Sequence, residues 1–321
     1  MIAALVSVFL LYPQPVPAAE HHSAPVPQEC AAAHSTCGFP DATNSGVPAG
    51  TILRTVPAQV SSGRGWTSTP DGSVHVTGDG AVLSGLYIPG TLDISASHVT
   101  IRDVRVVTGG NFGISLRHTT GVIIENCTIS GANKTSGRVN YAIDDVYGDS
   151  TGMVIKANNI SYFRTGAQVS TGLISRNYIH DPGYLPGDHT NGIYVNGGTR
   201  PLTISGNTIF NDLTQTDDIN LDASGTLRQA VANKIVTGNL LAGGGYSIYG
   251  GAALRAATSN IVIKGNRFSK RYYPHGGRYG PIGYFDSRGR GNVWSGNVWS
   301  GPIRRDAGVD RSGQANVIPS P

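Results

Sequence analysis

The sequence predicts an all-β protein, a right-handed parallel β-helix that forms a single elongated domain. Two observations predict it: a short motif that recurs along most of the chain, and a composition rich in Gly and poor in charge. Gly supplies 44 of the 321 residues without a Gly-X-Y period, while charged residues make up 14% and apolar residues 39%. Such a chain is neither collagen-like nor disordered, and it must bury a core through many tight turns.

The recurring motif starts near residue 80 and places two apolar residues five positions apart. The first apolar residue lies in eight short segments: Val99-Thr100-Ile101, Ile123-Ile124-Glu125, Val154-Ile155-Lys156, Leu173-Ile174-Ser175, Thr203-Ile204-Ser205, Ile235-Val236-Thr237, Val262-Ile263-Lys264 and Val293-Trp294-Ser295. The second apolar residues are Val106, Ile129, Ile160, Ile179, Ile209, Leu241, Phe268 and Trp299. Short strands that recur every 19 to 32 residues cannot bury an apolar face alone, so successive coils must stack.

Six of the eight repeats carry an Asn between the two apolar residues. These are Asn158, Asn177, Asn207, Asn239, Asn266 and Asn297, whereas the first two repeats carry Val104 and Cys127. A side-chain amide at a tight bend bonds to its counterparts in the coils above and below, and Asn tolerates the left-handed backbone of such corners. The main rival, an antiparallel sandwich, requires hairpin turns every ~8–12 residues and no recurring Asn.

Each coil also carries a second strand after a variable loop. These strands are expected at residues 113–116, 141–145, 166–170, 192–196, 218–222, 247–251 and 283–286. Alternation sets Ile143, Ala167, Ile193, Ile219 and Ile248 inward, and it therefore aligns Asp144, Gln168, Tyr194, Asn220 and Tyr249 outward in one column, flanked by Asp218, Ser247, Asn196 and Asp222. Because adjacent coils lie about 4.8 Å apart, we expect this column to form a polar and aromatic groove.

The N-terminus is typical of an exported protein. Ile2 to Leu11 is an apolar run too short to span a membrane, and Val16-Pro17-Ala18-Ala19 follows it as a cleavage context. We therefore expect a signal peptide at 1–19, a mobile leader with a small Cys loop at 20–50, the β-helix domain at 51–301 with an N-terminal cap in 51–80, and a polar tail at 302–321. After removal of the signal the protein is expected to be secreted, free of membrane and monomeric.

Three cysteines fit an oxidising compartment. Cys30 and Cys37 enclose a six-residue loop and are expected to form a disulfide, whereas Cys127 lies in an apolar stretch and is expected to be an inert buried thiol. No Cys spacing typical of a metal finger is present.

The net charge of +4 conceals a difference between the two ends of the chain. Residues 1–250 hold 13 Lys or Arg against 17 Asp or Glu, whereas residues 251–321 hold 11 against 3. A local basic surplus indicates an anionic partner near the C-terminal end. The absence of any Lys/Arg-rich run argues against nucleic acid as that partner.

The stacked repeats over roughly residues 70–300 resemble the pectate-lyase-like β-helix superfamily, whose members are mostly secreted lyases and hydrolases that act on polysaccharides. Part of the chain is similar to polygalacturonases, with His189-Thr190-Asn191-Gly192, Asp217-Asp218 and Gly244-Gly245-Tyr246 at the positions of their three motifs. Only Asp217-Asp218 matches fully. The segment from Cys37 to Asn44 also resembles secreted actinobacterial β-helix proteins.

Polysaccharide lyases neutralise a uronate carboxylate, remove the C5 proton with a base and protonate the leaving oxygen. We expect His189 or Tyr194 to act as the base or the acid. The groups expected to bind the substrate or neutralise its carboxylate are Arg164, Tyr249, Lys270, Arg271, His275 and Arg278.

Two alternatives remain open from the sequence. A hydrolase would need a pair of Asp residues among Asp217, Asp218, Asp222 and Asp144, because Glu occurs only at Glu20, Glu29 and Glu125. Asp218 and Asp222 on one strand are too far apart, at about 13 Å, for an inverting pair. The same acids could instead bind Ca²⁺, although no cofactor is required by the sequence. The second alternative is a non-catalytic β-helix that binds carbohydrate or acts as a surface adhesin.

Overall fold

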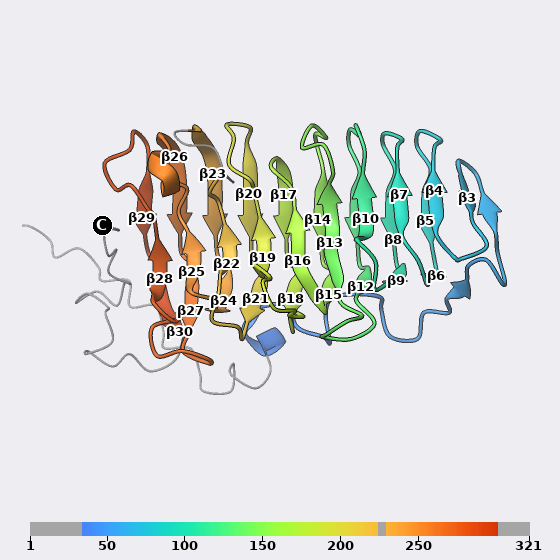
Figure 1. The fold of residues 1–321 in the computed structure, drawn as a ribbon, viewed down its shortest axis with the longest axis horizontal. Coiled ribbons are helices and arrows are strands. Elements are labelled where there is room, and N and C mark those ends of the chain that lie inside the picture. The colour runs from blue at the N-terminus through green and yellow to red at the C-terminus, as the bar shows by residue number, and fades with distance from the viewer. Residues whose placement is uncertain (1–33, 224–228, 301–321) are drawn as a thin grey trace, which may run out of the picture.

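The computed structural model describes residues 34–223 and 229–300. The chain winds through successive coils, and most coils contribute one strand to each of three sheets that run along the long axis of the molecule (Figure 1). Nearly all strand pairs are parallel, with apolar residues filling the interior between the sheets. The predicted parallel β-helix is confirmed.

Sheet A consists of β1 (Arg54–Thr55), β6 (Leu86–Ile88), β9 (Arg105–Val107), β12 (Thr128–Ser130), β15 (Asn159–Ser161), β18 (Tyr178–His180), β21 (Thr208–Asn211), β24 (Leu240–Gly243), β27 (Arg267–Ser269) and β30 (Val298–Ser300). Sheet B consists of β2 (Ser62–Gly63), β3 (Trp66–Ser68), β4 (Val74–Val76), β7 (Leu92–Ile94), β10 (Phe112–Leu116), β13 (Val139–Asp145), β16 (Phe163–Gln168), β19 (Asn191–Tyr194), β22 (Asp217–Asn220), β25 (Tyr246–Tyr249) and β28 (Gly280–Gly283).

Sheet C consists of β5 (Val82–Ser84), β8 (Thr100–Arg102), β11 (Ile123–Glu125), β14 (Val154–Lys156), β17 (Gly172–Ser175), β20 (Leu202–Ser205), β23 (Val231–Thr237), β26 (Thr258–Lys264) and β29 (Val293–Ser295). Two short 3-10 turns, η2 (His34–Cys37) and η3 (Ala253–Arg255), complete the described elements. Each coil passes from sheet C to sheet A, then across a loop to sheet B, and across a second loop back to sheet C.

The eight sequence repeats occupy the corner between sheets C and A. Their first apolar residues lie in sheet C, their second in sheet A, and the recurring Asn lies at the bend. All six Asn side chains are fully buried and form one ladder, in which each Nδ2 donates to the Oδ1 of the next Asn at 2.9 to 3.0 Å. The predicted amide ladder is confirmed.

The left-handed backbone at this corner belongs to the residue before each ladder Asn. That residue is Gly in the last four repeats, with φ from 61° to 65° at Gly206, Gly238, Gly265 and Gly296. In the two preceding repeats Ala157 and Arg176 adopt the same conformation, with φ of 55° and 56°. The expectation that the Asn itself takes this conformation is wrong. The preceding residue makes the bend, and the Asn side chain bonds along the stack.

The first coils end in antiparallel pairs, β2 with β3 and β3 with β4, while β4 joins the parallel stack through β7. Hairpins at the end of a stack cover an otherwise exposed strand edge. At the other end the last sheet B strand is β28 and not 283–286, since Ile282 pairs with Ile248 and takes the inward position.

Residues 34–50 contact the outer face of sheet A, and Figure 1 shows this segment running along one edge of the coils. Phe39 packs against the apolar cluster of Phe210, Leu240 and Ala242, and the Gly46 amide donates to the Ala157 carbonyl at 2.9 Å. The described part of the expected leader is therefore docked, which corrects the expectation of a mobile segment there. Cys37 is disulfide-bonded, although its predicted partner Cys30 lies outside the described residues.

Cys127 is a free, fully buried thiol, and burial raises its pKa to about 12. Its Sγ faces the carbonyl oxygens of Glu125 and Ile101 at 3.2 and 3.6 Å. A thiol so far from ionisation is chemically inert, as expected from the sequence.

Candidate functional site

The register of sheet B builds the predicted outward column. Asp144 pairs with Gln168, Gln168 with Tyr194, Tyr194 with Asn220, and Asn220 with Tyr249. Asp144 and Asn220 are nearly covered, with 4% and 8% exposure, so the column is accessible only in part. Groups far apart in the sequence thus become neighbours on one face.

The middle of this face is hollowed into a cleft of about 320 Å³, which we call the central cleft. Its polar lining includes Arg164, Gln168, His189, Tyr194 and Asn220. The cleft therefore unites the predicted acid-base pair, His189 and Tyr194, with the predicted carboxylate partner Arg164. It draws these groups from strands β16, β19 and β22 and from the loop that precedes β19.

Arg164 is held by an aromatic contact that leaves hydrogen-bonding capacity unused. Its guanidinium carbon lies 4.6 Å from the ring centre of Tyr141, a neighbour in the cleft lining. The Nε of Arg164 is buried and has no hydrogen-bond partner among the described residues. A guanidinium fixed through its face keeps its edge available, and that edge matches a carboxylate.

His189 is exposed, but its loop is anchored on both sides. Asp188 accepts two hydrogen bonds from the buried guanidinium of Arg138, at 2.6 and 2.7 Å. On the other side, the Thr190 carbonyl accepts from Asn211 Nδ2 at 3.2 Å and from the hydroxyl of Thr216. The imidazole is therefore presented to solvent by a fixed backbone, and the Asp that precedes it bonds to Arg138.

Asp217 and Asp218 lie beneath the cleft and not in it. Both are fully buried, and burial raises the pKa of each carboxyl well above its usual range. Asp217 accepts from Asn220 Nδ2 at 2.9 Å. Asp218 occupies the register position of Gly192, where a Cβ would meet the core side chain of Ile209, so its side chain points into the interior.

Asp222 is also buried, at 6% exposure, and burial raises its pKa to about 6. Its Oδ1 accepts from the Ala253 amide at 3.3 Å. None of the three predicted acids lines the central cleft. In addition, the described residues contain no group of three or more His, Cys, Asp or Glu side chains arranged to hold a metal ion. The geometry thus favours neither a carboxylate pair in the cleft nor a Ca²⁺ site in the described chain.

The predicted basic cluster does not converge on the central cleft. Lys270 lies 4.9 Å from the ring centre of Trp299, and Arg271 lies 5.3 Å from that of Phe210. Phe210 belongs to the small apolar cluster outside sheet A. Arg278 covers Tyr279 at 5.7 Å, and His275 lies on the same loop. These four groups lie outside the cleft lining, so only Arg164 of the predicted cations reaches the acid-base pair.

Tyr249 takes part in an aromatic cluster further along sheet B. It packs edge-to-face with Tyr246 and Tyr284, with ring centres 5.7 and 5.4 Å apart, and Tyr246 also contacts Tyr279 at 5.8 Å. Burial raises the pKa of the Tyr249 phenol. Aromatic faces beside a polar cleft are suited to stacking against sugar rings.

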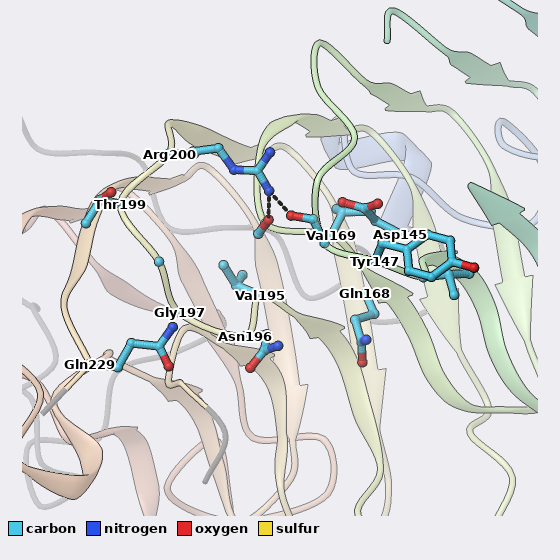
Figure 2. A pocket seen from close by; sticks show the side chains of 14 residues that line it. Asp145, Tyr147, Gln168, Val169, Val195, Asn196, Gly197, Thr199, Arg200 and Gln229 are labelled. Atoms are coloured by element: carbon cyan, nitrogen blue, oxygen red, sulfur yellow. Dashed lines mark hydrogen bonds between the residues drawn. The ribbon is translucent and has the colours of Figure 1, made fainter. Parts of the chain in front are cut away.

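Sequence reasoning missed a second pocket at the edge between sheets B and C, of about 450 Å³, which we call the notch (Figure 2). Asp145, Tyr147, Asn196 and Arg200 line it, and Gln168 lines both the notch and the central cleft. The only sequence signal is a difference in loop length. The loop at 169–171 is short, whereas the loops on either side of it, at 146–153 and 195–201, are longer. A short loop between two longer ones leaves a gap in the surface.

Asp144 lies on β13 next to Asp145, which lines the notch, and the sequence offered it only as a member of the column and of a possible hydrolytic Asp pair. Burial is the main cause that raises its pKa to about 7, the charge of Asp145 adds to this, and Arg117 and Arg164 oppose it. Its Oδ1 is buried and has no hydrogen-bond partner within the described structure. Asp144 in the column and its neighbour Asp145 thus each have a buried carboxyl oxygen without a hydrogen-bond partner in the described chain.

Comparison with known proteins supports the fold but goes no further. A family model described as a right-handed beta helix region matches residues 81–209. No curated protein matches the chain. None of the helices in the described ranges is long and apolar enough to cross a membrane. The match and the three parallel sheets identify the described chain as a right-handed parallel β-helix solenoid, a fold common among carbohydrate-active enzymes.

Proposed function

We propose that the protein is a secreted polysaccharide lyase that cleaves an anionic, uronate-containing polysaccharide by β-elimination in the central cleft. One observation carries the proposal: an unpaired guanidinium edge at Arg164, an exposed imidazole at His189 and a phenol at Tyr194 share one open cleft. These are the three kinds of group that the reaction requires.

The reaction assigns a separate task to each group. Arg164 binds the uronate carboxylate and withdraws charge, which acidifies the C5 proton. His189 or Tyr194 removes that proton, and its electron pair forms the C4–C5 double bond as the bond from C4 to the glycosidic oxygen breaks. The other group delivers a proton to the departing oxygen, so the products are an unsaturated uronate and a new chain end.

The buried acids favour the lyase over the hydrolase. A hydrolytic pair must reach the glycosidic bond and a water molecule from opposite sides. Asp217 and Asp218 are fully buried, and Asp218 faces the core. Secretion forms part of the proposal as well, and the disulfide at Cys37 supports it, since such bonds persist in oxidising compartments.

The test is an activity screen on a panel of uronate polymers, following ultraviolet absorbance of the unsaturated product alongside a reducing-end assay. We expect both signals for the native protein, and a fall in kcat of about 100-fold or more for His189→Ala and for Tyr194→Phe. Arg164→Lys should mainly raise KM, because an ammonium lacks the planar fork. His275→Ala and Tyr184→Phe, both exposed and outside the cleft, serve as matched controls with unchanged activity.

Each other outcome contradicts the proposal in its own way. Reducing ends without ultraviolet absorbance would make the protein a hydrolase. Retention on a polymer column with neither signal would make it a binding protein. Full activity of both His189→Ala and Tyr194→Phe would move the chemistry away from the central cleft.

A further inference from the structure

The notch is a rigid, preformed pocket. Its volume of about 450 Å³ lies within the ~300–1,000 Å³ range of small-molecule sites. Arg200 spans it from loop 195–201, donating to the Ser150 carbonyl at 3.1 Å, to the Ser170 hydroxyl at 2.8 Å and to the Gly148 carbonyl. Figure 2 shows this guanidinium reaching across the top of the pocket. Three loops are thereby tied together without a ligand.

A buried lysine reinforces the same corner. Lys234 is fully buried, and its Nζ donates to the carbonyl oxygens of Arg200 and Ser170 at 2.6 and 3.0 Å. The backbone on two sides of the notch is therefore held by Lys234 as well as by the Arg200 side chain. A pocket whose walls need no ordering retains more of its interaction energy for a ligand.

One polar group in the notch lacks a partner. Asp145 is 3% exposed and lines the pocket; its Oδ1 accepts from the Ser150 amide at 3.3 Å. Its Oδ2 is buried, with no hydrogen-bond partner in the described chain. Leaving a buried polar atom without a hydrogen-bond partner lowers the free energy of unfolding by about 1–3 kcal/mol. A ligand hydroxyl, which can donate or accept, would satisfy Oδ2 whichever protonation state the carboxyl adopts.

The remaining walls suit a sugar. In Figure 2 the amides of Gln168 and Asn196 lie along the same side of the pocket, with the ring of Tyr147 near Asp145. Tyr147 is 56% exposed, and the ring of His118 stacks on it at 4.2 Å. An aromatic wall, two amides and a carboxyl form a set that recognises a ring bearing several hydroxyls.

The charge of the notch favours a neutral sugar over a uronate. Arg200 already donates to three protein oxygens. Asp145 presents a carboxyl, which would repel a carboxylate or compete with it. This contrasts with the central cleft, where the edge of Arg164 remains unpaired.

We propose that the notch binds a neutral sugar that branches from the anionic polysaccharide whose main chain occupies the central cleft. Gln168 supplies the connection, because this one side chain lines both pockets. The inference rests on the proposed function for the position of the main chain, but neutral-sugar binding in the notch stands independently of catalysis. The substrate class becomes a branched acidic polysaccharide.

The first experiment measures binding of galactose, arabinose and galacturonate by saturation-transfer NMR and calorimetry. We expect the two neutral sugars to bind more tightly than galacturonate, and Tyr147→Ala and Asp145→Ala each to weaken neutral-sugar binding about tenfold. Tyr184→Ala, which removes an exposed tyrosine outside the notch, should change nothing. Absence of neutral-sugar binding, or equal binding by Tyr147→Ala, would overturn the proposal.

The second experiment compares a linear galacturonate oligomer with one that carries a single galactose branch. We expect tighter binding of the branched oligomer by the native protein and loss of that advantage in Tyr147→Ala, with cleavage of the linear oligomer unchanged. Neutral sugars that bind while the branched oligomer gains nothing would contradict the link to the cleft. If His189→Ala retains neutral-sugar binding while the native protein shows no lyase activity, the proposed function alone fails.

Discussion

Buried polar groups are hydrogen-bonded in the Asn ladder, whereas several on the outer face of sheet B have no partner in the described chain. In the ladder every amide is fully buried and bonded to its neighbour in the stack. On sheet B, Arg164 Nε, Asp144 Oδ1 and Asp145 Oδ2 are buried without hydrogen-bond partners in the described chain. Because native proteins rarely leave such groups without partners, the first arrangement is a device of the fold. The second lies in or beside two pockets, and it therefore indicates a place for a ligand.

Breaking the ladder should have the largest effect. Asn207 accepts from both the backbone amide and Nδ2 of Asn177, and donates to Asn239 Oδ1 and the Ile174 carbonyl. Asn207→Ala leaves these groups buried and unpaired, so we expect the free energy of unfolding to fall by about 3 kcal/mol or more. Urea unfolding measures it, with Asn111→Ala as the control at an exposed amide pair. Equal losses in both variants would contradict a structural ladder.

The buried carboxyls of sheet B and of the loop that follows β22 should make the stability of the protein depend on pH. Burial raises the pKa of Asp144 to about 7 and that of Asp222 to about 6, from 3.8. The folded state therefore keeps these protons to a higher pH than the unfolded state does. The contribution of these two groups to the free energy of unfolding is largest below about pH 4 and is lost as the pH rises to about 7. We expect a lower Tm at pH 8 than at pH 5.

The variant Asp144→Asn tests which group is responsible. Each pKa unit corresponds to about 1.4 kcal/mol, so the rise from 3.8 to about 7 corresponds to about 4 kcal/mol. Removing this carboxyl should raise the free energy of unfolding at pH 8 by up to that amount and leave that at pH 4 nearly unchanged. Asp212→Asn, at an exposed loop position, should show neither effect. A pH-independent change would mean that Asp144 is not the group that titrates.

The smallest effect is expected where the ladder ends. Cys127 occupies the ladder position in an early coil, and its amide already donates to Asn158 Oδ1 at 2.9 Å. The Ile101 carbonyl lies 3.6 Å from its Sγ, in the place where later coils bind an amide. Cys127→Asn should therefore extend the ladder and change the free energy of unfolding by less than about 1 kcal/mol. A large loss would show that the site of Cys127 does not accept an amide side chain, and it would contradict the expected extension of the ladder.

The sequence predicted the coils well because every coil repeats the same local problem. An apolar residue, a bend and a second apolar residue recur with little variation, and each must align with its counterpart in the next coil. The register Gln168, Tyr194 and Asn220 followed from that alignment by alternation. Tyr194 followed from the same alignment, whereas Arg164 and His189 were chosen for the chemistry that a lyase requires, and the structure brings all three into one cleft.

Alternation failed at Asp218. Strict period-two alternation places it outward because Ile219 is inward, yet both residues are fully buried, and Asp218 shares the register position of Gly192. A Cβ at Gly166 or Gly192 would likewise meet core side chains of sheet A. Two successive positions of these strands therefore face the interior, and no sequence pattern marked that break.

The sequence by itself determined the stack of coils, its amide ladder and the face on which polar groups gather, because these depend on a pattern that neighbouring coils share. Only the tertiary structure decided which polar groups meet a pocket. The basic loop after β27 packs toward sheet A, the acids of β22 are buried, and the notch opens where loop lengths differ. Loops lack a repeat, so their paths follow from the particular neighbours they contact in three dimensions.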